Sequence, residues 1–123
     1  MFNVIVSKSL KTLSKKEVIQ LKDLSDAVKL DNATQENGSV MIYNVSNIVT
    51  VDLVSDDPDN PQEYTKTVVI DSEGNRFVTG SDAFARRAWN IAEEMDGDEF
   101  GFKVYRRPSK NYAGREFLSC SVI

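Results

Sequence analysis

Apolar and polar residues alternate along several segments in the last two thirds of the chain, and this two-residue period is typical of β-strands. The longest segment covers residues 40–54 and is dominated by β-branched side chains. A strand of that length usually bends, and we expect the bend near Asn47. Shorter strands are predicted at residues 64–71 and 76–79, joined by a turn in which Gly74 supplies positive φ.

One segment has the helical period instead. In residues 82–95 apolar side chains recur at three- and four-residue spacing. Ser81 is the predicted N-cap and Gly97 the predicted left-handed terminator. Trp89 lies on the flank of the apolar stripe, where a core position is the more favoured interpretation and a base-stacking platform the alternative.

Two more strands are predicted after the helix, at residues 100–107 and 117–122. The order is then three strands, one helix and two strands. This order predicts a mainly β protein of the OB-fold class, a five-stranded barrel with one α-helix between strands 3 and 4. Such barrels commonly bind oligonucleotides.

The N-terminal part of the chain is less regular, and we predict two regions: an N-terminal extension, 1–37, and an OB-fold domain, 38–123. Ser14 and Glu17 fit a capping box at the start of a helix. Apolar residues with helical spacing follow, namely Val18, Leu21, Leu24 and Val28. The extension is expected to be helical or irregular, and it either packs on the domain or serves as an arm for self-association.

The amino-acid composition limits the kinds of catalytic and metal sites that the chain can form. The chain has 123 residues, a formal net charge of −4 and no histidine. Without histidine the commonest general base is absent, and Cys120, the only cysteine, cannot form a thiolate metal cage. We find no glycine-rich phosphate loop and no apolar run long enough for a membrane span. We therefore expect no enzymatic activity, no catalytic residue, no cofactor, no metal, no membrane association and a cytoplasmic location.

The segment from Gly101 to Arg115 reverses the overall charge. Its five cations are Lys103, Arg106, Arg107, Lys110 and Arg115, and it contains no acid. Aromatic residues lie among them, namely Phe102, Tyr105 and Tyr112. Cations interspersed with rings suit a polyanion whose bases can stack, which is a single-stranded nucleic acid.

The predicted strand at residues 100–107 determines which side chains of this segment face solvent and which face the core. Side chains on a strand alternate, so Lys103, Tyr105 and Arg107 are expected on the exposed face and Phe102 with Val104 in the core. The following loop could fold over a bound strand with Lys110, Tyr112 and Arg115. Further candidate nucleic-acid-binding residues on other strands are Tyr43, Tyr64, Lys66, Phe77 and Phe117.

Three stretches together give a resemblance to a known family. They are GSVMIYNVSNI, EYTKTVVIDSEGNRFVTGSDAFARRAW and FGFKVYRRPSKNYAGREFLSCSVI. This pattern resembles the small single-stranded DNA-binding proteins of tailed phages that infect Gram-positive bacteria, including short-tailed Bacillus phages with protein-primed replication. Residues 1–37 have no counterpart in it.

The resemblance implies an OB-fold that coats exposed single strands during phage DNA replication or recombination, without sequence preference. The matching functional positions are Lys103, Tyr105 and Arg107. The expected partners are single-stranded DNA or RNA, a second copy of the chain and replication proteins. The expected location is the cytoplasm of the infected bacterial host.

The negative charge also supports another function. Four aspartates cluster in and just before the loop at residues 55–63, and acidic residues end the predicted helix. These features favour an acidic phage-encoded protein-interaction module that acts on a host enzyme. A nuclease that uses carboxylates and a divalent ion is the least favoured alternative.

Overall fold

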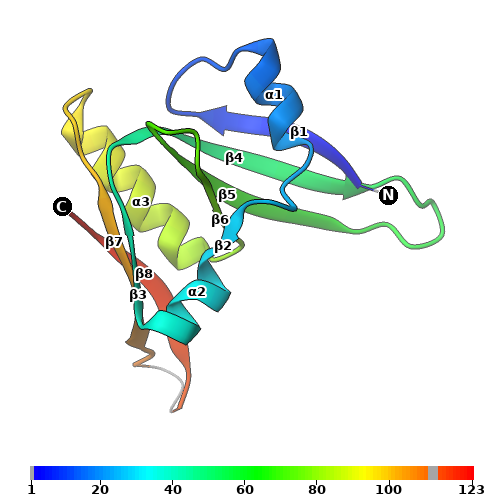
Figure 1. Ribbon diagram of the computed structural model, residues 1–123. Helices are drawn as coiled ribbons and strands as arrows, with labels where there is room; N and C mark the ends of the chain where they lie inside the picture. Colours follow the sequence, from blue (N-terminus) through cyan, green and yellow to red (C-terminus); the bar gives the residue numbers. More distant parts are fainter. Residues whose placement is uncertain (1, 111–113) are drawn as a thin grey trace.

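The computed structural model describes residues 2–110 and 114–123, and its strands form two separate sheets (Figure 1). The five-stranded sheet has the order β1 (Phe2–Ser9), β4 (Val45–Ser55), β5 (Glu63–Asp71), β6 (Arg76–Thr79) and β2 (Val28–Lys29). The three-stranded sheet has the order β3 (Ser39–Ile42), β7 (Phe102–Pro108) and β8 (Glu116–Val122). The prediction of a mainly β protein is confirmed.

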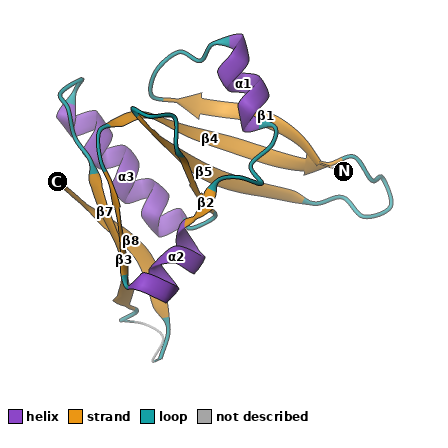
Figure 2. Cartoon of the chain, in the orientation of Figure 1, coloured by secondary structure: helices purple, strands orange, loops and turns teal. Residues whose placement is uncertain are grey.

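Three helices accompany the sheets in the described residues: α1 (Lys15–Leu21), α2 (Leu30–Asn37) and α3 (Asp82–Met95). The prediction of α3 is confirmed at both ends. The Ser81 hydroxyl accepts a hydrogen bond from the Phe84 N–H at 3.2 Å. Asp96 and Gly97 then leave the helix with φ of 47° and 91°. As Figure 2 shows, α3 lies between the two sheets.

Two apolar clusters hold these layers together. The larger one surrounds α3 and draws on both sheets, with Ile48, Val69, Phe84, Phe102 and Leu118 among its members. The second lies on the opposite face of the five-stranded sheet and includes Leu21 of α1, which lies on that side of the sheet in Figure 2. The layers therefore run from α1 through the five-stranded sheet and α3 to the three-stranded sheet.

The long strand predicted at residues 40–54 is broken. Its first part is β3 and its second part is β4, and the two belong to different sheets. The break falls at Tyr43 and Asn44, where Asn44 adopts a left-handed φ of 54°, which asparagine tolerates better than most residues. The irregularity predicted near Asn47 is also found, because the register between β4 and β5 shifts between Val45 and Asn47. Asn47 also anchors the N-terminal segment, since its Oδ1 accepts from the Lys11 N–H at 2.9 Å.

The region predicted as an N-terminal extension contributes to the sheet. β1 pairs with β4 in antiparallel register from Phe2 to Ser9, with one irregularity between Val6 and Lys8. The predicted capping box of Ser14 and Glu17 is confirmed. The boundary between regions at residue 37 stays a prediction.

The helix predicted behind this capping box is shorter than its apolar spacing suggested. α1 ends at Leu21, and Val28 belongs to β2. Arg76 of β6 explains the early end, because its Nη1 donates to the carbonyl oxygens of Gln20 and Asp23 at 2.6 and 2.8 Å. These contacts satisfy carbonyl groups that a longer helix would have used.

The finer prediction of a five-stranded OB-fold barrel is not shown. The described strands number eight and are divided between two sheets, with no closed barrel. The predicted position of the helix is nevertheless found, because α3 follows β6 and precedes β7.

Candidate nucleic-acid interface

β7 is the central strand of the three-stranded sheet, and its side chains alternate between the core and the surface. Phe102 and Val104 are fully buried against α3 and its neighbours. Lys103 and Arg107 are exposed, and Tyr105 is half-buried. Lys103, Tyr105 and Arg107 therefore share the face that points away from the core, with the alternation that the sequence predicts.

The neighbouring strands complete this surface. Tyr105 pairs with Ser39 of β3 and with Ser119 of β8. Lys103 pairs with Met41 and Ser121, and Arg107 pairs with Phe117. We call this surface the β7 face; its residues are Ser39, Met41, Lys103, Tyr105, Arg107, Phe117, Ser119 and Ser121.

Serines lie on either side of the central ring of the β7 face. Ser39 and Tyr105 are half-buried, and Ser119 is 9% exposed. Apolar side chains further out are partly open to solvent, with Met41 38% and Phe117 37% exposed. The face thus offers two rings and a thioether against which a planar group can lie.

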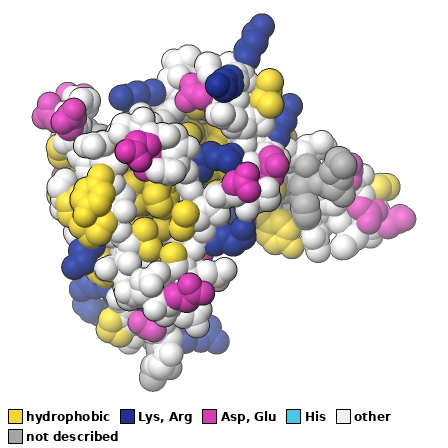
Figure 3. All heavy atoms as spheres, viewed as in Figure 1, with side chains coloured by type: hydrophobic (Ala, Val, Ile, Leu, Met, Phe, Trp, Pro, Cys, Tyr) yellow, Lys and Arg dark blue, Asp and Glu magenta, His cyan; other side chains and the backbone are white. Residues whose placement is uncertain are grey.

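The charge of the β7 face is positive. None of its residues is acidic, although the chain contains 19 Asp and Glu residues. Within the described residues the side chains of Lys103 and Arg107 make no hydrogen bond or ion pair, so both charges can meet an anion. Figure 3 shows Lys and Arg side chains along the left edge of the view, on the side where β7 runs.

Arg106 lies on the same strand but has a different role. Its Nε donates to Thr34 Oγ1 at 3.2 Å, and its Nη2 donates to the carbonyl oxygen of Asp31 at 2.7 Å. Both partners belong to α2. Arg106 therefore fixes α2 to the end of β7, whereas its neighbour Arg107 faces solvent.

The loop candidates lie beyond the end of β7. Lys110 and Arg115 are exposed, and Tyr112 falls outside the described residues. Tyr43 follows β3 at the other end of the three-stranded sheet, is 62% exposed and lines an open hollow together with Gly101 and Ile123.

The remaining candidates are elsewhere. Tyr64 and Lys66 belong to β5 of the five-stranded sheet, so they do not join the β7 face. Phe77 is only 9% exposed and packs in the core around α3. Its ring cannot stack on a base, and that candidate is wrong. Phe117 joins the β7 face, and Met41 is a member of this face that the sequence did not single out.

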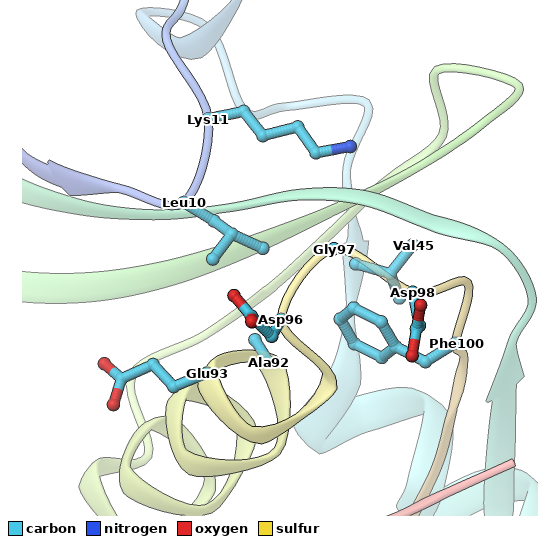
Figure 4. A pocket seen from close by; sticks show the side chains of 9 residues that line it. All are labelled: Leu10, Lys11, Val45, Ala92, Glu93, Asp96, Gly97, Asp98 and Phe100. Carbon is cyan, nitrogen blue, oxygen red and sulfur yellow. The ribbon is translucent and has the colours of Figure 1, made fainter.

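A second hollow, of about 360 Å³, lies at the C-terminal end of α3 (Figure 4). Its apolar residues are Leu10, Val45, Ala92 and Phe100. Its carboxylates are Glu93, Asp96 and Asp98, with Lys11 at the edge. Glu93 also pairs with Lys8 at 3.4 Å. The carboxylates would repel phosphate, so this hollow suits a cationic or apolar side chain rather than a nucleic acid.

In residues 2–110 and 114–123, no group of three or more His, Cys, Asp or Glu side chains is arranged to hold a metal ion. No helix in them is both long and apolar enough to cross a membrane.

Comparison with known proteins gives no relative for the chain. No protein-family model, no curated protein and no solved structure matches it. A function for this protein therefore depends on the chemistry of its own surfaces, of which the β7 face is the most fully formed.

Proposed function

We propose that the protein binds single-stranded DNA through the β7 face, without sequence preference. The observation that carries the proposal is the pair of unpaired cations, Lys103 and Arg107, on either side of the Tyr105 ring in a face without carboxylates. The biological setting, protection of exposed strands during phage DNA replication or recombination, follows from the family resemblance of the sequence.

The geometry suits a flexible, unpaired strand. Lys103 and Arg107 are four residues apart, about 13 Å along an extended chain, with Tyr105 midway between them. Each cation can neutralise a phosphate, while a base lies on the ring. Such stacking contributes about 1–3 kcal/mol per base and accepts any base, since every base has a π-face. An absence of sequence preference follows from this mode of binding.

Binding of this kind needs an open sheet face and does not depend on a closed barrel. The OB-fold therefore stays a prediction. Binding to RNA, pairing with a second copy of the chain, contact with replication proteins and a location in the cytoplasm of the infected host also stay proposals.

Substitution of Tyr105 tests the proposal directly. Tyr105→Ala should weaken binding to oligo-dT by about 1–3 kcal/mol, because the stacking platform is lost. Tyr105→Phe keeps the ring and should bind nearly as well as the unmodified protein. Affinity is measured by fluorescence anisotropy of a labelled oligo-dT at low salt, and thermal unfolding of each variant checks that the fold is kept. Equal affinity of the alanine and phenylalanine variants, or no binding at low salt, would exclude the proposed site.

The acidic hollow in Figure 4 favours a second candidate function. An apolar floor with three carboxylates at its edge can receive a basic and apolar segment of another protein, as expected for an interaction module that acts on a host enzyme. Co-purification of a stoichiometric host protein, together with no retention of oligonucleotide, would support this function over DNA binding.

A further inference from the structure

A second basic surface lies on the α1 side of the five-stranded sheet. Two adjoining hollows there, of about 230 and 300 Å³, share Leu24, Lys29 and Leu53 in their linings. Lys66 lines the first hollow and Lys22 the second. We call the combined surface the lysine groove, defined by Lys22, Lys29 and Lys66 around a floor of Leu24, Leu53 and Val78.

The short length of α1 explains why this groove is open. Side chains alternate along β5, so Tyr64 and Lys66 point to the same side of the sheet as Val68. Val68 is buried in the cluster that includes Leu21 of α1. Because α1 has only seven residues and ends at Leu21, Tyr64 is left 47% exposed and Lys66 half-buried.

The lysines of the groove have unused charges. In the part of the chain that the structure describes, the side chains of Lys22, Lys29 and Lys66 make no hydrogen bond or ion pair. The groove has one carboxylate in its lining, Asp31, and its Oδ2 already accepts a hydrogen bond from Thr79 Oγ1 at 2.8 Å. The lining is therefore net positive in a chain whose net charge is −4.

Gly80 leaves space for the side chain of Lys66. Its Nζ lies 3.2 Å from the position that a Cβ would occupy on Gly80, so the absence of a side chain at Gly80 leaves space for the ammonium group. Figure 3 shows Lys and Arg side chains near the centre of the view, next to β2 and the start of α2.

An aromatic ring extends the groove. Tyr64 of β5 pairs directly with Leu53 of β4, which belongs to the floor of both hollows. Lysines beside a partly exposed ring repeat the combination found on the β7 face. The five-stranded sheet and the core around α3 separate the two surfaces.

We propose that the lysine groove is a second site for single-stranded nucleic acid, so that one chain holds two short strands at once. The choice of ligand rests on the proposed function, whereas the position of the site does not. Phosphates would lie against Lys22, Lys29 and Lys66, and a base would lie on Tyr64. Two strands held by one chain are kept at high local concentration, which would favour their pairing.

The test counts bound strands per chain with an oligo-dT of about eight nucleotides, which is short enough to occupy a single site. Native mass spectrometry at low salt should show two strands per chain for the unmodified protein. The groove variant, Lys22→Gln with Lys29→Gln and Lys66→Gln, should show one. A control with the same change of charge on exposed lysines, Lys11→Gln with Lys15→Gln and Lys16→Gln, should still show two.

The variants also separate this inference from the proposed function. Tyr105→Ala with Arg107→Gln should leave one strand bound in the groove. If the unmodified protein binds one strand, or if the groove variant still binds two, the inference is wrong while the β7 face can stand. If the groove variant binds none and the β7 variant binds as before, the lysine groove is the binding site and the proposed role of the β7 face is wrong.

Discussion

Cys120 lies in the core on β8, only 1% exposed, with its side chain beside Val104 and the residues of α3. Burial raises the pKa of its thiol to about 12, and the nearby Arg87 guanidinium offsets only a small part of this effect. Arg87 Nε also donates to the carbonyl oxygen of Cys120 at 3.4 Å, which ties α3 to β8. The thiol therefore behaves as a small apolar group.

The raised pKa has a measurable consequence. Near pH 9, where an ordinary thiol is half ionised, Cys120 should stay protonated in the folded protein and should not react with a thiol reagent. Reaction should begin once urea unfolds the chain. As a matched control, Ser121→Cys in a Cys120→Ala background places a thiol on the half-exposed neighbouring position and should react in the native state. Equal reactivity of the two thiols in native protein would contradict the burial of Cys120.

At the residue scale, the sequence predicts side-chain direction well on one strand and poorly on others. On β7 the alternation of Phe102 and Val104 with charged residues is unambiguous, and the structure has the same alternation. Phe77 and Tyr64 are different, because both lie on strands whose register depends on pairing with distant segments. A shift of one residue would exchange core and surface, so neither could be assigned in advance.

At the scale of elements, α3 is predictable because all of its signals are local. Its N-cap, apolar stripe and left-handed end lie within a few residues of it. The break between β3 and β4 has a single local signal, Asn44 with its left-handed φ, and the rest depends on the two halves joining different sheets. In β4 the residues Asn47, Ile48 and Val49 are all buried, because layers cover both faces of the strand and hide its alternation.

Adjacent arginines at the end of β7 give an element-scale prediction. Arg106→Gln should lower the free energy of unfolding by roughly 1–2 kcal/mol, because α2 loses charge-assisted hydrogen bonds from the guanidinium. Arg107→Gln should leave stability nearly unchanged but should reduce the salt dependence of DNA binding, by about 0.7 in the slope of log affinity against log salt. Urea unfolding and anisotropy titrations at several salt concentrations measure the two effects.

The two variants serve as controls for each other, since each removes one positive charge from neighbouring positions. A general electrostatic effect of the segment would change DNA binding equally in both. The assignment of Arg106 to α2 and of Arg107 to the β7 face would then be wrong.

At the scale of the whole molecule, the layers could not be predicted from the sequence, because they depend on pairings between distant segments. β1 pairs with β4 across 40 to 53 residues, and β3 pairs with β7 across 60 to 66. The sequence predicts only in part how the positive charges gather on particular surfaces of a chain that is negative overall. The cations between Gly101 and Arg115 stood out in the sequence, but Lys22, Lys29 and Lys66 come together only in the folded chain.

This separation of charge predicts a preference for single strands over duplexes. Long-range repulsion from a chain of net charge −4 opposes binding to any DNA and is strongest for a duplex, whose charge density is high. Contacts with rings such as Tyr105 and Phe117 can offset this repulsion only where bases are unpaired, because a duplex keeps its bases stacked inside.

Competition between single and double strands tests this preference. Unlabelled oligo-dT should compete with labelled oligo-dT at equal concentration. The same strand annealed to oligo-dA should need at least about a tenfold excess, because a loss of about 1.4 kcal/mol of stacking lowers the affinity tenfold. Competition is measured by anisotropy at low salt, where the attraction of Lys103 and Arg107 for phosphate and the long-range repulsion are both least screened. If the duplex competes as well as the single strand, phosphate contacts alone account for binding and the rings of the β7 face have no part in it.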